Sequence, residues 1–206
     1  VMPIPLASIK HGATSIWGND VVLEPGKKIM LNAASGKGKS TFTFTTLGIR
    51  FDYDGTILFD NKDIRTISTD EWTELRRSTL SVVFQDLQLF PSLTVKENLL
   101  LKNSLTNSYT EAELLQQLEY LGIGDKWNQK CGLLSMGQQQ RVAIIRALAQ
   151  PFKWLIMDEP FSHLDEENTQ LCLQLIEKRT NELNAGFVLT TLGDDYHFPY
   201  DYTLNL

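Results

Sequence analysis

The chain has 206 residues, enough for one substantial hydrophobic core. Apolar residues make up 42% and charged residues 21% of it, as in ordinary globular proteins. With 25 acidic against 19 basic residues, the formal net charge is −6, which argues against a broad basic nucleic-acid surface. Two cysteines, Cys131 and Cys172, are too few and too far apart for a disulfide framework, so we expect both to be reduced and buried.

Short apolar runs alternate with helical patterns along the chain, which is typical of an α/β sheet protein. No run approaches the ~20 apolar residues that cross a bilayer, and Val1–Leu6 lacks the features of a signal peptide. Half-exposed strands are predicted at Val21–Glu24 and Thr56–Phe59, with Pro25-Gly26 as a hairpin turn after the first of them. The predicted buried strands are Lys28–Asn32, Ser81–Phe84, Trp154–Met157, Phe187–Thr191 and Tyr202–Leu206.

Helix starts are marked by capping residues. Capping boxes pair Ser68 with Glu71, Thr110 with Glu113 and Ser135 with Gln138, ahead of helices predicted at Trp72–Arg77, Leu114–Leu121 and Val142–Leu148. Asp165 is predicted to cap a long helix that ends near Asn184. Because residues 86–150 are mostly helical in pattern and predicted strands flank them, we expect one domain: a core of residues 1–85 and 151–206 with an inserted helical lobe.

The most informative segment is Ala33-Ala34-Ser35-Gly36-Lys37-Gly38-Lys39-Ser40, which lies between a predicted strand and a predicted helix, Thr41–Leu47. In this context backbone N–H groups surround a phosphate. Lys39 would place its charge on the terminal phosphates, and the Ser40 hydroxyl would ligate Mg²⁺. The motif departs from the usual pattern at Ala33, where glycine is expected, and a chance glycine-rich turn is the alternative interpretation.

Two further segments carry chemistry. A predicted strand ends in Asp158-Glu159, where the first carboxylate can hold a metal shell and the second can orient or deprotonate a water. Taken alone, an acidic pair is equally typical of a solvated turn. Ser135 and Gly137 open a predicted helix and form a second anion-binding end, for which a plain helix cap is the alternative. Two such elements in one chain are compatible with two copies that each contribute half of a site.

The order and spacing of these motifs resemble the ATPase subunit of ATP-binding cassette (ABC) systems over essentially the whole chain. The segments that carry the resemblance are Leu134-Ser135-Met136-Gly137-Gln138 for the signature, Val83-Phe84-Gln85 for the Q-loop, Asp158-Glu159-Pro160 for the Walker B end and Ser162-His163-Leu164-Asp165 for the D-loop. Gln85–Leu99 is most similar to the lipoprotein-release and macrolide-efflux branch. The resemblance implies a P-loop NTPase core with an antiparallel β subdomain and an inserted helical lobe.

The resemblance also implies a role for each matching residue. ATP would be bound by Ala33, Ala34, Ser35, Gly36, Lys37, Gly38, Lys39, Ser40 and Thr41, and by Ser135, Gly137, Gln138 and Asp165. Mg²⁺ would be held by Ser40, Gln85 and Asp158, and Glu159 and Gln85 would be the catalytic residues. The expected partners are a membrane permease and a second ATPase subunit, in a homodimer or a heterodimer, on the cytoplasmic face of the cell membrane.

Three departures from the family pattern fall on nucleotide-contacting motifs: Ala33, Met136 and Leu192. Leu192 stands where the family has its switch histidine, and leucine cannot donate a hydrogen bond to a γ-phosphate. His197 is the nearest substitute, although an exposed histidine is the commoner case. His11 is the candidate for stacking on adenine, and Trp17 is interpreted as a packing residue. We therefore predict Mg-ATP binding with slow hydrolysis.

The leading hypothesis is a transporter ATPase that closes on two ATP molecules. A second is a regulatory or structural subunit that couples ATP binding without turnover. A third, a DNA-repair ATPase of the related coiled-coil type, needs long heptad insertions, and roughly 50 residues between Gln85 and Ser135 leave no room for them. The acidic charge also disfavours it. Transported substrate and direction depend on the membrane partner.

Overall fold

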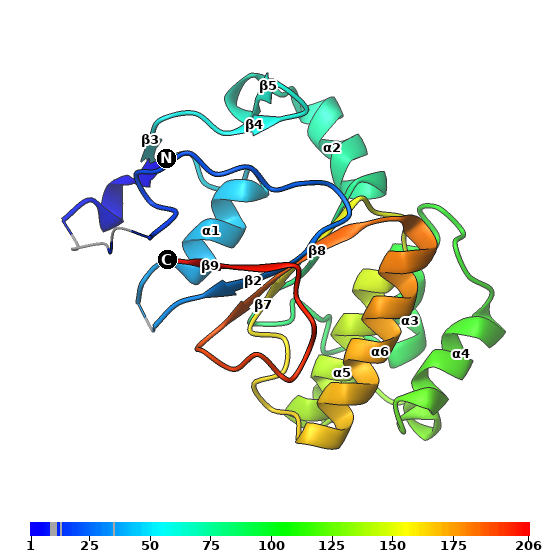
Figure 1. Ribbon diagram of the computed structural model, residues 1–206. Helices are drawn as coiled ribbons and strands as arrows, with labels where there is room; N and C mark the ends of the chain where they lie inside the picture. Colours follow the sequence, from blue (N-terminus) through cyan, green and yellow to red (C-terminus); the bar gives the residue numbers. More distant parts are fainter. Residues whose placement is uncertain (9–11, 13, 35) are drawn as a thin grey trace.

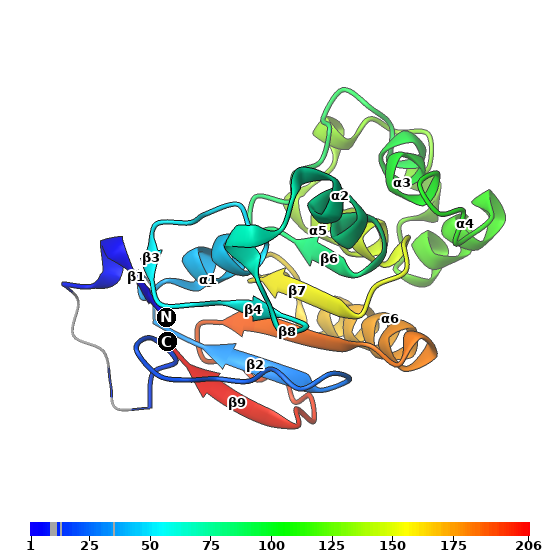
Figure 2. The ribbon, with the colours of Figure 1, turned by 90° about the horizontal axis from the view of Figure 1, so that it is seen from above.

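The computed structural model describes residues 1–8, 12, 14–34 and 36–206 (Figure 1). At its centre lies a five-stranded sheet, whose strands follow one another in a row in Figure 2. Their order is β6 (Leu80–Val83), β7 (Trp154–Asp158), β8 (Gly186–Thr191), β2 (Lys28–Asn32) and β9 (Tyr202–Asn205). Every neighbouring pair is parallel. The carboxyl ends of the strands therefore meet at one edge, where open α/β sheets bind their ligands.

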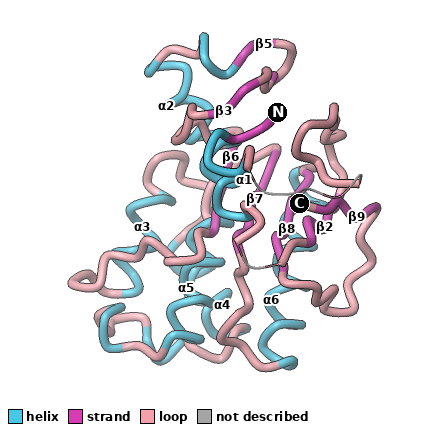
Figure 3. Tube along the Cα trace, turned by 90° about the vertical axis from the view of Figure 1, so that its left-hand side faces the viewer, coloured by secondary structure: helices cyan, strands magenta, loops and turns pink. Residues whose placement is uncertain are grey.

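The two faces of the sheet bury different side chains because successive residues of a strand point to opposite sides. On β7, Leu155 and Met157 belong to the larger core cluster, which also takes in the helices of the second half of the chain, whereas Ile156 belongs to another cluster. The larger cluster holds residues of α5 (Met136–Leu148) and α6 (Glu166–Leu183), and of α3 (Val95–Asn103) and α4 (Glu111–Tyr120), which pack on α5. Residues of α1 (Lys39–Thr46) and α2 (Thr69–Ser78) belong to the clusters on the other face. Figures 1 and 3 show α3, α4 and α5 gathered together.

Short antiparallel pairs flank the sheet. They join β1 (Met2–Pro3) to β3 (Tyr53–Asp54) and β4 (Leu58–Phe59) to β5 (Lys62–Asp63). The strand predicted at Thr56–Phe59 is thus shorter than expected, and the strand predicted at Val21–Glu24 is wrong: this segment is irregular. Pro25-Gly26 forms a turn, with Gly26 at a φ of +76°, but no hairpin. No described strand pairs with Val21–Glu24, and Val22 is 78% exposed.

Local capping chemistry sets the helix starts. The capping boxes predicted at Ser68, Thr110 and Ser135 are all present. A further box, Thr94 with Glu97, starts α3, which the sequence pattern did not single out. Asp165 accepts a hydrogen bond from the Asn168 N–H and caps the start of α6, and Asn184, which caps the end of this helix, takes a left-handed φ of +49°. Short 3₁₀ turns occur at Ile4–Leu6, Ile64–Thr66, Gly124–Lys126 and Cys131–Leu133.

Both cysteines are free and buried, as expected. Burial raises the pKa of the Cys131 thiol to about 11 and that of the Cys172 thiol to about 12, so neither is ionised near neutral pH. Among the helices that the structure describes, none is both long and apolar enough to span a membrane.

Candidate nucleotide site

A cavity of about 250 Å³ opens at the carboxyl edge of the sheet. The loop after β2, the segment after β6 and the end of β7 all contribute to it, because parallel strands bring these three points to the same edge. Its lining consists of Leu6, Gly36, Gly38, Lys39, Ser40, Thr41, Gln85 and Glu159. The phosphate loop, the Q-loop glutamine and the second carboxylate of the Asp158-Glu159 pair thus face one space.

Lys39 lies deep in this cavity, at 7% exposure. Its Nζ donates to the carbonyl oxygens of Ala33 at 3.2 Å and Ala34 at 3.4 Å, and it forms an ion pair with Glu159 Oε1 at 3.2 Å. The Glu159 side chain is itself only 15% exposed. A phosphate that enters the cavity would compete with this carboxylate for the same ammonium group. Occupation of the cavity and release of Glu159 are therefore linked.

The phosphate loop is braced by residues far from it in sequence. Gly38 has a φ of +103° and precedes α1; a Cβ there would lie 2.5 Å from Leu6 Cδ1 and 3.2 Å from Trp17 Nε1. Trp17 is 5% exposed, and its indole N–H donates to the carbonyl oxygen of Lys37 at 3.1 Å. Trp17 is therefore a packing residue, as predicted, but it also holds the loop by a hydrogen bond. Ser35 and His11, two residues that the sequence marked for nucleotide contacts, lie outside the described residues.

Asp158 ends β7 and is 2% exposed. In the register of the sheet it lies opposite Thr190 of β8, whose hydroxyl donates to Asp158 Oδ1 at 2.7 Å. The next residue, Glu159, has a left-handed φ of +48°, and its N–H donates to the Thr190 carbonyl oxygen at 3.2 Å. This turn directs the two consecutive carboxylates differently: Asp158 is held against β8, and Glu159 reaches Lys39.

The start of α5 is separate from this cavity. Of the described residues, Ser135, Gly137, Gln138 and Asp165 are not among those that line it. Ser135 Oγ accepts from the Gln138 N–H at 3.3 Å, and Gln138 Oε1 accepts from the Ser135 N–H at 3.0 Å. Both are thus helix caps within their own chain. These residues therefore do not share the cavity that the chain's own phosphate loop lines, within the described part of the chain.

The D-loop packs closely on α5. A Cβ at Gly137 would lie 2.7 Å from the carbonyl oxygen of His163, so glycine is needed for this approach. Gln140 of α5 donates to Ser162 Oγ at 2.9 Å and accepts from the His163 N–H at 3.0 Å. Ser162 follows Glu159 by three residues. The hydrogen bonds of Gln140 therefore connect the start of α5 with the segment that leaves the cavity.

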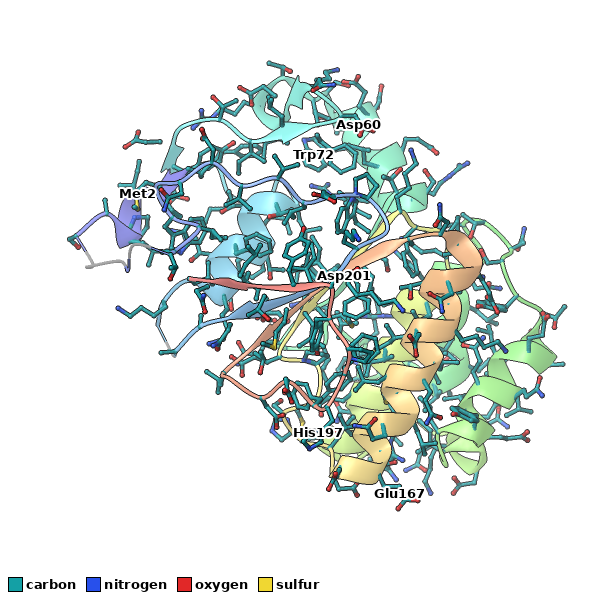
Figure 4. All side chains as sticks on the ribbon, viewed as in Figure 1. Met2, Asp60, Trp72, Glu167, His197 and Asp201 are labelled. Carbon is teal, nitrogen blue, oxygen red and sulfur yellow. The ribbon has the colours of Figure 1, made fainter. Side chains whose placement is uncertain are left out.

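Leu192 and His197, the two residues weighed for a switch position, are not among the described residues that line the cavity. Leu192 follows β8 and is 60% exposed. The His197 side chain is 85% exposed and lines a different cavity, together with Leu164 and Glu166 at the start of α6. Figure 4 shows His197 near the same end of α6 as Glu167. His197 is therefore not placed to substitute for a histidine at position 192.

Three contributors were not found from the sequence: Leu6, Thr190 and Gln140. The only signal for Thr190 is a pair of threonines that closes an otherwise apolar strand. Leu6 and Gln140 follow ordinary apolar and helical patterns, and only the fold brings them to the phosphate loop and the D-loop.

Fold and site together define a P-loop nucleotide-binding domain, with a phosphate loop between β2 and α1 and an acidic pair at the end of β7. A family model described as ABC transporter matches residues 18–162, and the chain belongs to this family as an ATP-binding subunit. The expected fold class, an α/β P-loop core with antiparallel strands, is confirmed.

Curated relatives support the assignment. The chain is 35% identical, over 88% of its length and 77% of the relative, to the lipoprotein-releasing system ATP-binding protein LolD of Leptospira interrogans. It is 34% identical, over 86% of its length, to the methionine import ATP-binding protein MetN of Corynebacterium glutamicum, of which it spans 50%.

Solved structures agree with the fold. The dimeric structure of MJ0796, a bacterial ABC transporter cassette, superposes with a TM-score of 0.78 at 27% identity, covering 90% of this chain and 84% of that one. A post-hydrolysis state of the same cassette bound to ADP and Pi has a TM-score of 0.75 at 30% identity, covering 84% of this chain and 78% of that one.

Proposed function

We propose that the chain binds Mg-ATP in the cavity at the carboxyl edge of the sheet and hydrolyses it slowly to drive a membrane permease. The observation that carries this proposal is the meeting of Lys39, Ser40, Gln85 and Glu159 in one cavity. Backbone N–H groups of the loop and the start of α1 would bind the phosphates, and Lys39 would neutralise their charge. Glu159, released from Lys39, would orient the attacking water or accept its proton.

The residues around the cavity fit Mg²⁺. Ser40 and Gln85 line the cavity, and the buried Asp158 adjoins Glu159, so the available ligands are all oxygens, which Mg²⁺ prefers. No three His, Cys, Asp or Glu side chains cluster as metal ligands in the described part of the chain, so ATP itself would supply the remaining oxygens. When bound, the ion would neutralise charge on the β- and γ-phosphate oxygens.

The second half of each site would come from another copy. Ser135 and Gln138 cap α5 away from the cavity, and Met136 beside them is 46% exposed. The start of a helix favours an anion, so this end is suited to the ATP held by a partner. The fold neighbour MJ0796 is described as dimeric, which supports a pair of ATPase subunits. Asp165, at the start of α6, would lie at the same interface.

We also propose one ABC ATPase domain with a core of residues 1–85 and 151–206 and a helical lobe of residues 86–150. Gln85 stands at the first junction and lines the cavity, which suits it to relay the state of the γ-phosphate to the lobe and to a permease. The chain would then lie on the inner face of the cell membrane, held by the permease.

The departures Ala33, Met136 and Leu192 support slow hydrolysis. Leu192 is exposed beyond β8 and offers no hydrogen-bond donor. The same observation favours the second candidate, a regulatory subunit that binds ATP with little or no turnover. Measurable ATP binding with no hydrolysis, in the presence of the permease, would support that candidate against the first.

The test of the leading proposal is Glu159→Gln. The amide keeps the size of the side chain but cannot accept the proton of the water, so we expect hydrolysis to stop and an ATP-dependent dimer to accumulate. Size-exclusion chromatography with light scattering reports the dimer. Glu74→Gln is the matched control, because Glu74 is a 61% exposed carboxylate on α2 and does not line the cavity, and it should leave the wild-type behaviour unchanged. A persistent Glu159→Gln monomer under saturating Mg-ATP would count against the model.

The cargo depends on the permease. The relatives named for lipoprotein release and for methionine import are nearly equally similar to the chain, at 35% and 34% identity. Affinity purification from native membranes, with identification of the co-purifying subunit, would assign it. Recovery of a permease would support the transporter proposal, and recovery of the chain alone from intact membranes would contradict it.

A further inference from the structure

Thr190 is the only residue whose described hydrogen bonds join it to both carboxylate-bearing residues at the end of β7. Its hydroxyl donates to Asp158 Oδ1 at 2.7 Å and accepts from the Glu159 N–H at 3.3 Å. Its carbonyl oxygen accepts from the same N–H at 3.2 Å. One side chain and its own backbone thus fix the metal-binding carboxylate and the turn that directs the catalytic one.

These contacts lie in a well-packed part of the sheet. Thr190 is fully buried, and Asp158 is 2% exposed. Thr190 lies opposite Asp158 in the parallel register of β7 and β8, so its hydroxyl is delivered to the carboxylate by the sheet itself. A hydroxyl has a single proton to donate, and here it goes to Oδ1. Within the described residues, no other group donates to the Asp158 side chain.

The consequence is a carboxylate with two unlike oxygens. Oδ1 is engaged by Thr190, whereas Oδ2 has no protein donor within the described residues and is left for a metal or its water shell. A partner that fixes the orientation of a ligating carboxylate typically changes metal affinity or activity by about 10- to 100-fold when it is lost. The Glu159 turn adds a second effect, since the left-handed φ of +48° places that side chain against Lys39.

We propose that Thr190 is a positioning residue that orients Asp158 for Mg²⁺ and holds the Glu159 turn. The Mg²⁺ dependence of ATP binding then depends on this residue of β8. This rests on the proposed function, because it takes Asp158 to be a metal ligand. Thr190 is not among the described residues that line the cavity, so it would act through the two residues that it holds.

The test compares Thr190→Val with Thr190→Ser. Valine has the shape of threonine without the hydroxyl and suits a strand, whereas serine keeps the hydroxyl. ATP affinity is measured by calorimetry, in EDTA and across a Mg²⁺ titration, with a non-hydrolysable ATP analogue. For Thr190→Val we expect the ATP affinity in EDTA to be unchanged. The Mg²⁺ concentration at which the increase in ATP affinity is half-maximal should rise by roughly tenfold. Thr190→Ser should restore the wild-type titration.

Thr180→Val is the matched control. Thr180 is equally buried, and its hydroxyl donates within α6 to Ile176, away from the cavity. It should lower the melting temperature as much as Thr190→Val or more, without moving the Mg²⁺ titration. If Thr190→Val does not fold, Thr190→Cys, whose thiol is a weak donor, should show an intermediate shift.

The outcomes separate two failures. If wild-type ATP binding does not respond to Mg²⁺, the proposed metal site is wrong, and with it the role of Thr190. If the wild type responds and Thr190→Val titrates identically, the metal site stands and the positioning role is overturned. A fall in affinity that is the same in EDTA and in Mg²⁺ would show a merely structural role and would also overturn it.

Discussion

The two elements that we propose to contact phosphate, the loop before α1 and the start of α5, are built differently. The loop is supported from within its own chain: Lys39 is 7% exposed and has three oxygen partners, and Trp17 donates to the loop backbone. At the start of α5, Ser135 only caps its helix, and the neighbouring apolar side chains Leu133 and Met136 are 72% and 46% exposed.

The difference supports the proposal that one chain provides the phosphate loop in a finished form, whereas the start of α5 needs a second chain. A buried lysine that already holds a carboxylate of its own chain can bind an anion without help from another chain, once that carboxylate is displaced. An exposed helix start with apolar neighbours gains most when another surface covers it. Changes in the loop should therefore alter ATP binding to a single chain, whereas changes at the start of α5 should alter only the association of two chains.

Lys39→Ala should give the largest effect. Hydrogen bonds to charged groups contribute about 1.5–3 kcal/mol, and a buried lysine should reach the upper value, so ATP affinity should fall by roughly 100-fold. Isothermal titration calorimetry on the single chain measures this loss. Lys27→Ala is the control, because Lys27 pairs with Asp201 on the surface and is 41% exposed. Unchanged ATP affinity in Lys39→Ala would show that the cavity is not the phosphate site.

Ser135→Ala should separate the two halves. ATP affinity of the single chain should be unchanged, while the ATP-dependent dimer formed in a Glu159→Gln background should weaken by roughly tenfold, or about 1.4 kcal/mol. Losing the cap also costs roughly 1 kcal/mol of stability. Ser68→Ala removes the cap of an equivalent capping box on α2. It should lower the stability of the chain as much as Ser135→Ala does, without any change in dimerisation. Equal dimerisation by both variants would contradict a role of Ser135 across an interface.

Local features of the fold could be predicted from the sequence, whereas features that depend on distant residues could not. Helix starts such as Ser68 and Ser135 were predicted because a cap and its partner lie three residues apart. The strand at Lys28–Asn32 was predicted with its observed bounds, since a buried run followed by a glycine-rich loop is specific. The prediction of a strand at Val21–Glu24 was wrong because a strand needs a neighbouring strand to pair with, and the local pattern carries no information about that neighbour.

The same distinction between local and long-range features applies to the candidate site. The family resemblance implied that Lys39, Ser40, Gln85 and Glu159 belong to one site, and all four line one cavity. Thr190 was missed because its partner is set by the register of β7 with β8, and a shift of one residue would turn its side chain to the other face.

Leu192→His should accelerate hydrolysis if the missing donor limits it. A preorganised donor at developing charge is worth about 100- to 1,000-fold in rate, and a donor placed in surroundings that evolved without it should recover roughly tenfold. Steady-state phosphate release measures the rate, with ATP affinity determined in parallel. His197→Ala should leave the rate unchanged, because His197 lines the other cavity. No acceleration by Leu192→His would assign the slow step to Ala33 or Met136 instead.

Trp17→Phe is the smallest and most selective change to the loop. Phenylalanine keeps an aromatic ring against Gly38 but removes the N–H that donates to the Lys37 carbonyl oxygen at 3.1 Å. A neutral hydrogen bond contributes about 1 kcal/mol, so ATP affinity should fall by roughly fivefold. Trp127→Phe, which alters a half-buried indole near Lys96, is the control for loss of an indole elsewhere.

The Trp17 result decides how the loop is held. If the hydrogen bond organises the loop, ATP affinity falls while the melting temperature of the empty protein changes as little as it does in Trp127→Phe. If the indole serves only the core, the melting temperature falls and ATP affinity does not. Because the loop has Ala33 where its family pattern has glycine, a brace from Trp17 would show that part of the turn's geometry is now imposed from outside the motif.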